Sequence, residues 1–352
     1  MVEKIRDPYF DLIKLVAIFM VVFSHVQSYR PGFSFADMPS LSLNLIMVVN
    51  MPLFFIISGY FSRKLHESSD KIKLVDRLIS YFWPMAFFAV FSALVDSVVF
   101  HKYSATDVPI CLAKKFLLGG WFFWALACCD VITFCAYKYS KTCFCRDLIG
   151  VVAYFGCLCV GDRVPHVTNI VAMIPFYWFG LLILPALLSR TILFTSTAAA
   201  GAVAMLWATC FAGNIATNGL SFYWDRFDVW HPEGVKAVNM ILRYLIGVVG
   251  GVCVMVAVKM FIRMLPAMRY LAPLGKETLG IYFLQGYMIH WISNRFVKLD
   301  ADVGIMILAA CFVLLLSFGI VKISKQSSFA KQLVWGMRLS EFLAVQNKRV
   351  SV

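Results

Sequence analysis

Long apolar stretches separated by short polar segments run from the first residues of the chain almost to its end. Ten of them approach the length of about 20 residues that a helix needs to cross a bilayer. This pattern predicts an all-α, polytopic integral membrane protein with about ten transmembrane helices, of which the fifth is the shortest. The ten stretches are residues 9–27, 41–61, 78–100, 117–137, 148–160, 168–188, 192–212, 237–262, 278–297 and 303–321.

The amino-acid composition leads to the same class of protein. Of the 352 residues, 61% are hydrophobic and 14% are charged, whereas soluble domains have roughly 45–50% and about 25%. The eleven cysteines lie mostly inside apolar stretches, where a free cysteine behaves as a small hydrophobic residue. Cys143 and Cys145 form a Cys-x-Cys pair without further ligands nearby, so we expect no metal site. An ordinary soluble enzyme and a disulfide-stapled secreted domain are both excluded.

The formal net charge is +13, and its distribution predicts how the chain is oriented. Lys and Arg gather in the cytoplasmic loops of membrane proteins. If the N-terminus is cytoplasmic, 21 of the 32 Lys and Arg residues fall in inner segments, 9 in outer segments and two inside spans. We therefore expect both termini in the cytoplasm, the plasma (inner) membrane as the location and the lipid bilayer as a partner. No nucleic-acid partner is expected.

Two regions follow from the same pattern. Residues 1–324 form a transmembrane domain, and residues 325–352 form a basic tail. The tail is amphipathic, which is typical of a helix that lies on the anionic cytoplasmic leaflet.

The first apolar stretch carries three ionisable residues, namely Asp11, Lys14 and His25. Asp11 and Lys14 are three positions apart, a spacing that brings two side chains together on a helix. The eleven positions from Lys14 to His25 turn the helix by about 1100°, close to three full turns. All three side chains therefore fall along one stripe. Ionisable residues inside a span are functional candidates, although an ion pair and an interfacial histidine are the structural alternatives.

This stripe is also the part of the chain that resembles a known family. An acidic residue, a basic residue three positions later and a histidine after ten more residues are similar to the opening motif of the membrane-bound acyltransferase-3 family. Three later segments resemble further motifs of that family in the same order. They are MPLFFIISGYFSRK (51–64), WFFWAL (121–126) and LGKETLGIYFLQGYMIHW (274–291). The family often has Arg at the position of Lys14 and His at the position of Gln285.

The resemblance implies an acyltransferase that moves an acyl group, usually acetyl from acetyl-CoA, to a hydroxyl of a glycan or lipid-linked glycan. Acyl-CoA is then a donor substrate, and no permanently bound cofactor is expected. Histidine suits the role of general base near neutral pH, so His25 is the expected base, and Lys14 and Asp11 support it. Arg63 and Lys64 are candidates for binding the donor. The other motif residues are Ser58, Gly59, Tyr60, Trp121, Thr278, Tyr282 and Gln285.

Two other functions are alternatives to acyl transfer. A transporter or flippase of glycan or lipid precursors would also have many spans and buried charges. It would need polar residues on several helices, whereas here they are concentrated on the first. A sensor or scaffold without catalysis would explain neither the stripe nor the ordered motifs.

Overall fold

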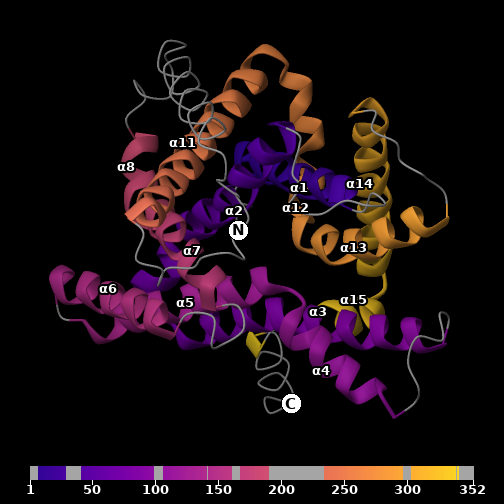
Figure 1. Ribbon diagram of the computed structural model, residues 1–352, viewed down its shortest axis with the longest axis horizontal. Helices are drawn as coiled ribbons and strands as arrows, with labels where there is room; N and C mark the ends of the chain where they lie inside the picture. Colours follow the sequence, from indigo (N-terminus) through magenta and orange to yellow (C-terminus); the bar gives the residue numbers. More distant parts are fainter. Residues whose placement is uncertain are drawn as a thin grey trace, which may run out of the picture. The chain divides into compact units, whose positions relative to one another are not determined.

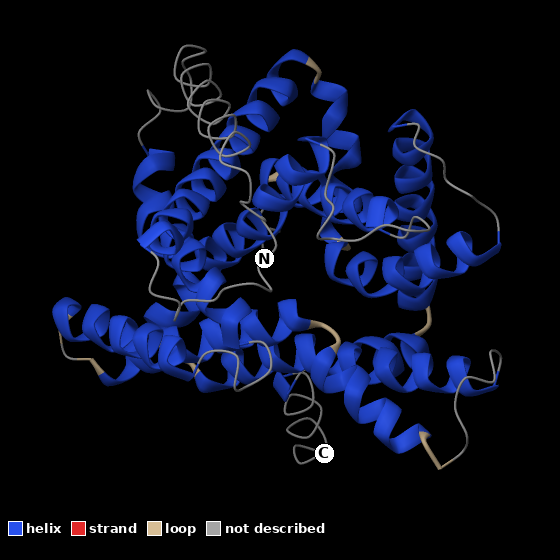
Figure 2. Cartoon of the chain, in the orientation of Figure 1, coloured by secondary structure: helices blue, strands red, loops and turns tan. Residues whose placement is uncertain are grey.

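A computed structural model describes residues 7–28, 41–98, 106–140, 142–160, 167–189, 234–295, 303–337 and 339–340. Every element that these residues form is a helix, and none is a strand (Figure 2). The all-α prediction is therefore confirmed for the described residues.

Figure 1 labels the helices of the described residues in the order in which they follow along the chain. The first six are α1 (Pro8–Ser28), α2 (Leu41–Ser68), α3 (Lys71–Val98), α4 (Val108–Leu118), α5 (Trp121–Tyr139) and α6 (Cys143–Val160). The next three form one continuous helical segment: α7 (Val167–Trp178), the π-helical turn η3 (Phe179–Ile183) and α8 (Leu184–Ser189). The remaining elements are α11 (Gly234–Met264), the 3₁₀-helix η5 (Pro266–Leu271), α12 (Ala272–Lys276), α13 (Thr278–Arg295), α14 (Val303–Gln326) and α15 (Ser328–Trp335).

Six segments among the described residues are long and apolar enough to cross a membrane. The expected spans 41–61, 148–160 and 278–297 lie on α2, α6 and α13, which are not among the six. The expected span 192–212 lies outside the described residues. The chain is thus a membrane protein by its helices, while the number of about ten stays a prediction. The six segments are Pro8–Gln27, Lys71–Val98, Trp121–Tyr139, Asn169–Ser189, Tyr244–Met264 and Val303–Gln326.

The chain divides into two compact units, and each is made of two separate stretches of sequence. Unit 1 comprises Met1–Tyr60 and Pro175–Val321, and unit 2 comprises Phe61–Ile174 and Lys322–Val352. The expected tail, residues 325–352, falls in unit 2. Its separation from the transmembrane domain at residue 324 stays a prediction.

In unit 1, α2 approaches the end of α7 and the η3 turn backbone to backbone. A Cβ atom on Gly59 would overlap the backbone carbonyl of Tyr177, and one on Gly180 would overlap the carbonyl of Ile56. Small residues allow this close approach of helices in membranes. The glycine of the Ser58-Gly59-Tyr60 motif therefore has a packing role.

In unit 2, α15 and Ser340 contact α3. The indole Nε1 of Trp83 donates a hydrogen bond to the carbonyl of Leu333 at 3.0 Å. Beyond α15, the hydroxyl of Ser340 donates to the carboxylate of Asp76 at 2.6 Å. These contacts attach the tail to α3; its position relative to the leaflet remains a prediction.

Candidate active site

The helix that carries the polar stripe, α1, lies in the core of unit 1 and contacts α11, α12 and α13. Its apolar residues Leu12, Ile13, Ala17, Ile18, Val21 and Val22 are at most 2% exposed. Asp7 caps the start of the helix, because its carboxylate accepts a hydrogen bond of 2.9 Å from the backbone N–H of Tyr9. Pro8 occupies the first helical position, where its missing N–H breaks no helical bond. Packing on several sides fixes where the polar side chains of α1 can point.

Asp11 and Lys14 form the ion pair that their spacing predicts. The Nζ atom of Lys14 lies 3.9 Å from Oδ1 of Asp11, and the two side chains are 21% and 1% exposed. The backbone of Asp11 also touches α12, where a Cβ atom on Gly275 would overlap the carbonyl of Asp11. Gly275 therefore lets α12 pack closely against the turn of α1 that carries the ion pair.

His25 contacts Gln285, a residue of α13 that is 260 positions away in the sequence. The Nδ1 atom of His25 lies 2.8 Å from Nε2 and 3.0 Å from Oε1 of the Gln285 amide. Gln285 is 2% exposed. When Oε1 accepts the proton of Nδ1–H, the lone pair of the other ring nitrogen, Nε2, is available to accept a proton. The contact thus connects the first motif with the last one.

The remaining motif residues divide between the two units. In unit 1, the ring of Tyr60 stacks on that of Phe10, with centroids 4.9 Å apart, so the second motif also contacts α1. Thr278 begins α13, and Tyr282 lies on that helix three residues before Gln285.

In unit 2, Trp121 is the first residue of α5. Arg63 and Lys64 are exposed near the end of α2, and Arg63 forms a 2.7 Å ion pair with Glu67. Their expected role in binding the donor stays a prediction.

Unit 2 contains a buried charged cluster that the sequence did not single out. Asp130 of α5 is fully buried, and its Oδ2 lies 2.8 Å from Nε of Arg77. The hydroxyl of Tyr81 donates to Oδ2 at 3.0 Å, and that of Ser62 donates to Oδ1 at 3.2 Å. Asp130 is the only charged residue in the apolar stretch 117–137. An ionisable residue within a span is a functional candidate, as those of α1 are. The sequence alone could therefore have identified Asp130 as a candidate.

The comparisons with known proteins agree with the motifs. A family model described as an acyltransferase domain, that of the acyltransferase-3 family, matches residues 7–322. No curated protein and no solved structure matches the chain. The match covers all the motif residues, from Asp11 to Gln285. The apolar helices indicate that the chain is a membrane protein. The chain therefore belongs to the acyltransferase-3 family of membrane acyltransferases.

Proposed function

We propose that this protein transfers an acyl group from acyl-CoA to a hydroxyl of a cell-surface polysaccharide or lipid-linked glycan, with His25 as the general base. The observation that carries the proposal is the contact between His25 and Gln285. It gives His25 a defined orientation next to a second motif of the family resemblance. Acetyl is the acyl group that the family resemblance favours, and acetyl-CoA is then the donor substrate.

In the chemical step, one nitrogen of His25 transfers the proton and the other holds the ring in place. Nε2 takes the proton of the sugar hydroxyl, whose oxygen attacks the carbonyl carbon of the thioester and forms the new ester. The carbon–sulfur bond breaks, and the thiolate of CoA receives the proton back from the imidazolium. Gln285 holds the ring through Nδ1 during both transfers. The ion pair of Asp11 and Lys14 supports α1 below this centre.

We further propose that the protein resides in the plasma (inner) membrane with both termini cytoplasmic. The excess of Lys and Arg in the inner segments supports this orientation. Lys14 is then nearer the cytoplasm, and His25 lies about 16 Å farther out along the helix axis, at about 1.5 Å per residue. A donor that enters from the cytoplasm would present its thioester to an acceptor in the outer half of the bilayer.

The test compares cell-surface glycans by mass spectrometry in cells that express the wild-type protein, His25→Gln or no protein. Wild-type cells should show glycans heavier by one acyl group, and both other samples should lack this mass. The expected loss of acylation in the variant is at least about 100-fold, the lower end for removing a general base. A His25→Gln protein that is present at normal level in the membrane and still acylates at a near-normal rate would contradict the proposal.

The alternative is a transporter or flippase of glycan or lipid precursors, and one observation favours it. The ion pair of Arg77 with the buried Asp130 places charge on α3 and α5, in addition to α1. The same mass spectrometry separates the two functions. Loss of a flippase removes the glycan from the surface, whereas loss of an acyltransferase leaves the glycan there without its acyl group.

A further inference from the structure

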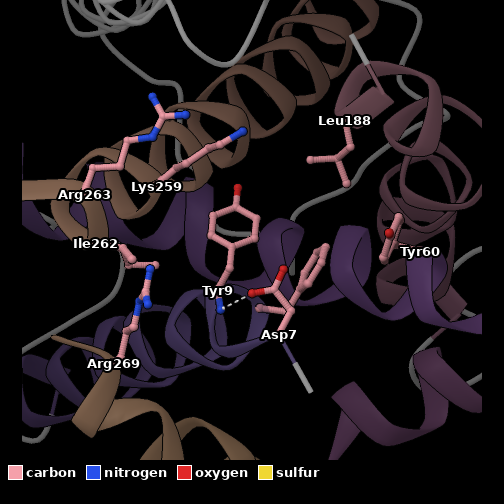
Figure 3. A pocket seen from close by; sticks show the side chains of 9 residues that line it. Asp7, Tyr9, Tyr60, Leu188, Lys259, Ile262, Arg263 and Arg269 are labelled. Atoms are coloured by element: carbon pink, nitrogen blue, oxygen red, sulfur yellow. Dashed lines mark hydrogen bonds between the residues drawn. The ribbon is translucent and has the colours of Figure 1, made fainter. Parts of the chain in front are cut away.

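A pocket of about 400 Å³ opens at the start of α1, in unit 1 (Figure 3). Four helices contribute most of its wall. The start of α1 provides Asp7, Tyr9 and Phe10, and α11 provides Lys259, Ile262 and Arg263. Tyr60 comes from α2 and Leu188 from α8. Arg269 of η5 completes the lining. The pocket is separate from the residues assigned to proton transfer, and none of its three cations belongs to a motif discussed above.

Cations dominate the charge of this pocket. Lys259, Arg263 and Arg269 line it together with a single carboxylate, that of Asp7. The carboxylate of Asp7 already accepts the N–H of Tyr9 as the cap of α1. Lys259 and Arg263 are four residues apart on α11, and like charges at this spacing repel each other. A bound anion removes that repulsion, and guanidinium and ammonium groups are the usual ligands of phosphate.

Aromatic rings form the other part of the wall. Phe10 and Tyr60 are stacked, with an angle of 19° between their planes. The hydroxyl of Tyr9 donates to the carbonyl of Met255 at 3.1 Å, which fixes the position of its ring. Figure 3 shows Lys259 and Arg263 on one side of Tyr9 and Tyr60 with Leu188 on the other. Flat apolar surfaces beside cations suit a ligand that joins an aromatic base to a phosphate.

The position of the pocket along α1, relative to Lys14 and His25, indicates which end of the donor fits in it. From Tyr9 to Lys14 the helix rises by about 7.5 Å, and from Lys14 to His25 by about 16 Å. The pantetheine arm of CoA has the backbone length of about four extended residues, or about 14 Å. Phe10, Lys14 and His25 fall within a sector of about 60° around the helix. A donor whose diphosphate lies at the level of Lys14 has its nucleoside at the pocket and its thioester near His25.

We propose that this pocket binds the 3′-phosphoadenosine end of the acyl-CoA donor, with Lys259, Arg263 and Arg269 facing the 3′-phosphate and Phe10 with Tyr60 facing the adenine. The proposal rests on acyl-CoA being the donor in the proposed function. It assigns the nucleotide end of that donor to α11 and η5, elements outside the motifs of the family resemblance.

The test measures binding instead of turnover, with purified protein in phosphatidylcholine nanodiscs. Calorimetry compares CoA with 3′-dephospho-CoA, which lacks only the 3′-phosphate. The wild-type protein should bind CoA at least about tenfold more tightly, as expected for charge-assisted contacts to one phosphate. The double variant Lys259→Met with Arg263→Gln should bind CoA as weakly as 3′-dephospho-CoA, and its affinity for the latter should change less than about threefold. Arg269→Gln should give a smaller change in the same direction.

The matched control is Lys276→Met, which removes an exposed cation of α12 that does not line the pocket. It should bind both ligands like the wild-type protein. Equal affinity of the wild-type protein for the two ligands overturns the pocket assignment and leaves acyl-CoA as the donor. Absence of binding of either ligand by the wild-type protein contradicts the donor itself.

An anionic lipid headgroup has the same phosphate chemistry, so a second series uses nanodiscs with phosphatidylglycerol. The affinity for CoA should then stay within about threefold of that in phosphatidylcholine. Displacement of CoA by phosphatidylglycerol, with loss of lipid retention in the double variant, assigns the pocket to a lipid and overturns the proposal.

Discussion

Gln285 and His25 contact each other through Nδ1 of the His25 ring, which lies 2.8 Å from Nε2 and 3.0 Å from Oε1 of the Gln285 amide. The amide can either accept a proton from Nδ1 or donate one to it. Only the first arrangement leaves Nε2 unprotonated and able to act as a base. In the proposed mechanism, Gln285 therefore selects the tautomer of His25 in which Nε2 can accept a proton.

Replacing Gln285 with Leu should lower kcat by about tenfold to 100-fold, because the ring loses its orientation and its preferred tautomer but the base remains. Gln285→Glu keeps an acceptor for Nδ1–H and should retain most of the activity. Its carboxylate also stabilises the protonated ring, so the acidic limb of the kcat profile should move to higher pH. Initial rates of acyl transfer from pH 5 to pH 9 measure both effects. Wild-type rates in the Leu variant would remove Gln285 from the mechanism.

Lys14→Arg should keep substantial activity, because the charge next to Asp11 remains and the family often has Arg there. Lys14→Ala should lose most of the activity, since it leaves the carboxylate of Asp11, which is 1% exposed, without its cation. The measurement is acyl transfer at equal protein level in the membrane. Equal losses in the two variants would argue against a simple role of charge at this position.

Gly275→Ala should lower the free energy of unfolding by about 1–3 kcal/mol, the usual range for overpacking. The new Cβ overlaps the backbone carbonyl of Asp11, which cannot rotate away as a side chain could. Thermal unfolding in detergent, followed by tryptophan fluorescence, reports the loss. Gly286→Ala on α13 is the matched control, because a Cβ there meets no atom within 4 Å. Similar melting temperatures for the two variants would contradict the close packing of α12 on α1.

His66 should make stability depend on pH. It is fully buried beyond the expected span 41–61, and burial together with the charge of Arg77 lowers its pKa to about 3. In the unfolded chain its pKa is about 6.5. Between these values the unfolded chain binds more protons, so the contribution of His66 to stability is present above pH 6.5 and declines as the pH falls, by up to about 1.4 kcal/mol per pH unit.

The experiment compares the melting temperatures of the wild-type protein and His66→Gln from pH 7.5 to pH 5. The difference between them should change with pH, because carboxylates that titrate in both proteins cancel. A constant difference over this range would show that the neutral ring of His66 is not required by the fold.

Local sequence patterns predicted the features of this protein that depend on residues close together in the sequence. The helical fold follows from the length of the apolar stretches, and the Asp11–Lys14 pair follows from the spacing of two residues on one helix. The contact of His25 with Gln285 joins two helices that are 260 residues apart, and no periodicity encodes such a pair.

The same reason explains what the sequence did not reveal. Asp130 was visible as a lone acidic residue, but its partners Arg77, Tyr81 and Ser62 come from other helices. The predicted span 168–188 is found as one helical segment, and the structure adds a π-helical turn within it at Phe179–Ile183. The hydrophobic pattern does not reveal the change in backbone hydrogen bonding at that turn.

The division of each unit into distant stretches of sequence sets an order of events during synthesis. α1 is made before α13, and Gln285 follows His25 by 260 residues. At about 5–20 residues per second, this interval is about 13–52 s. Asp11 and Lys14 neutralise each other from within one turn and need no later helix. The ion pair therefore lowers the cost of placing α1 in the bilayer as soon as that helix forms, whereas the orientation of His25 becomes defined only after α13 has been made.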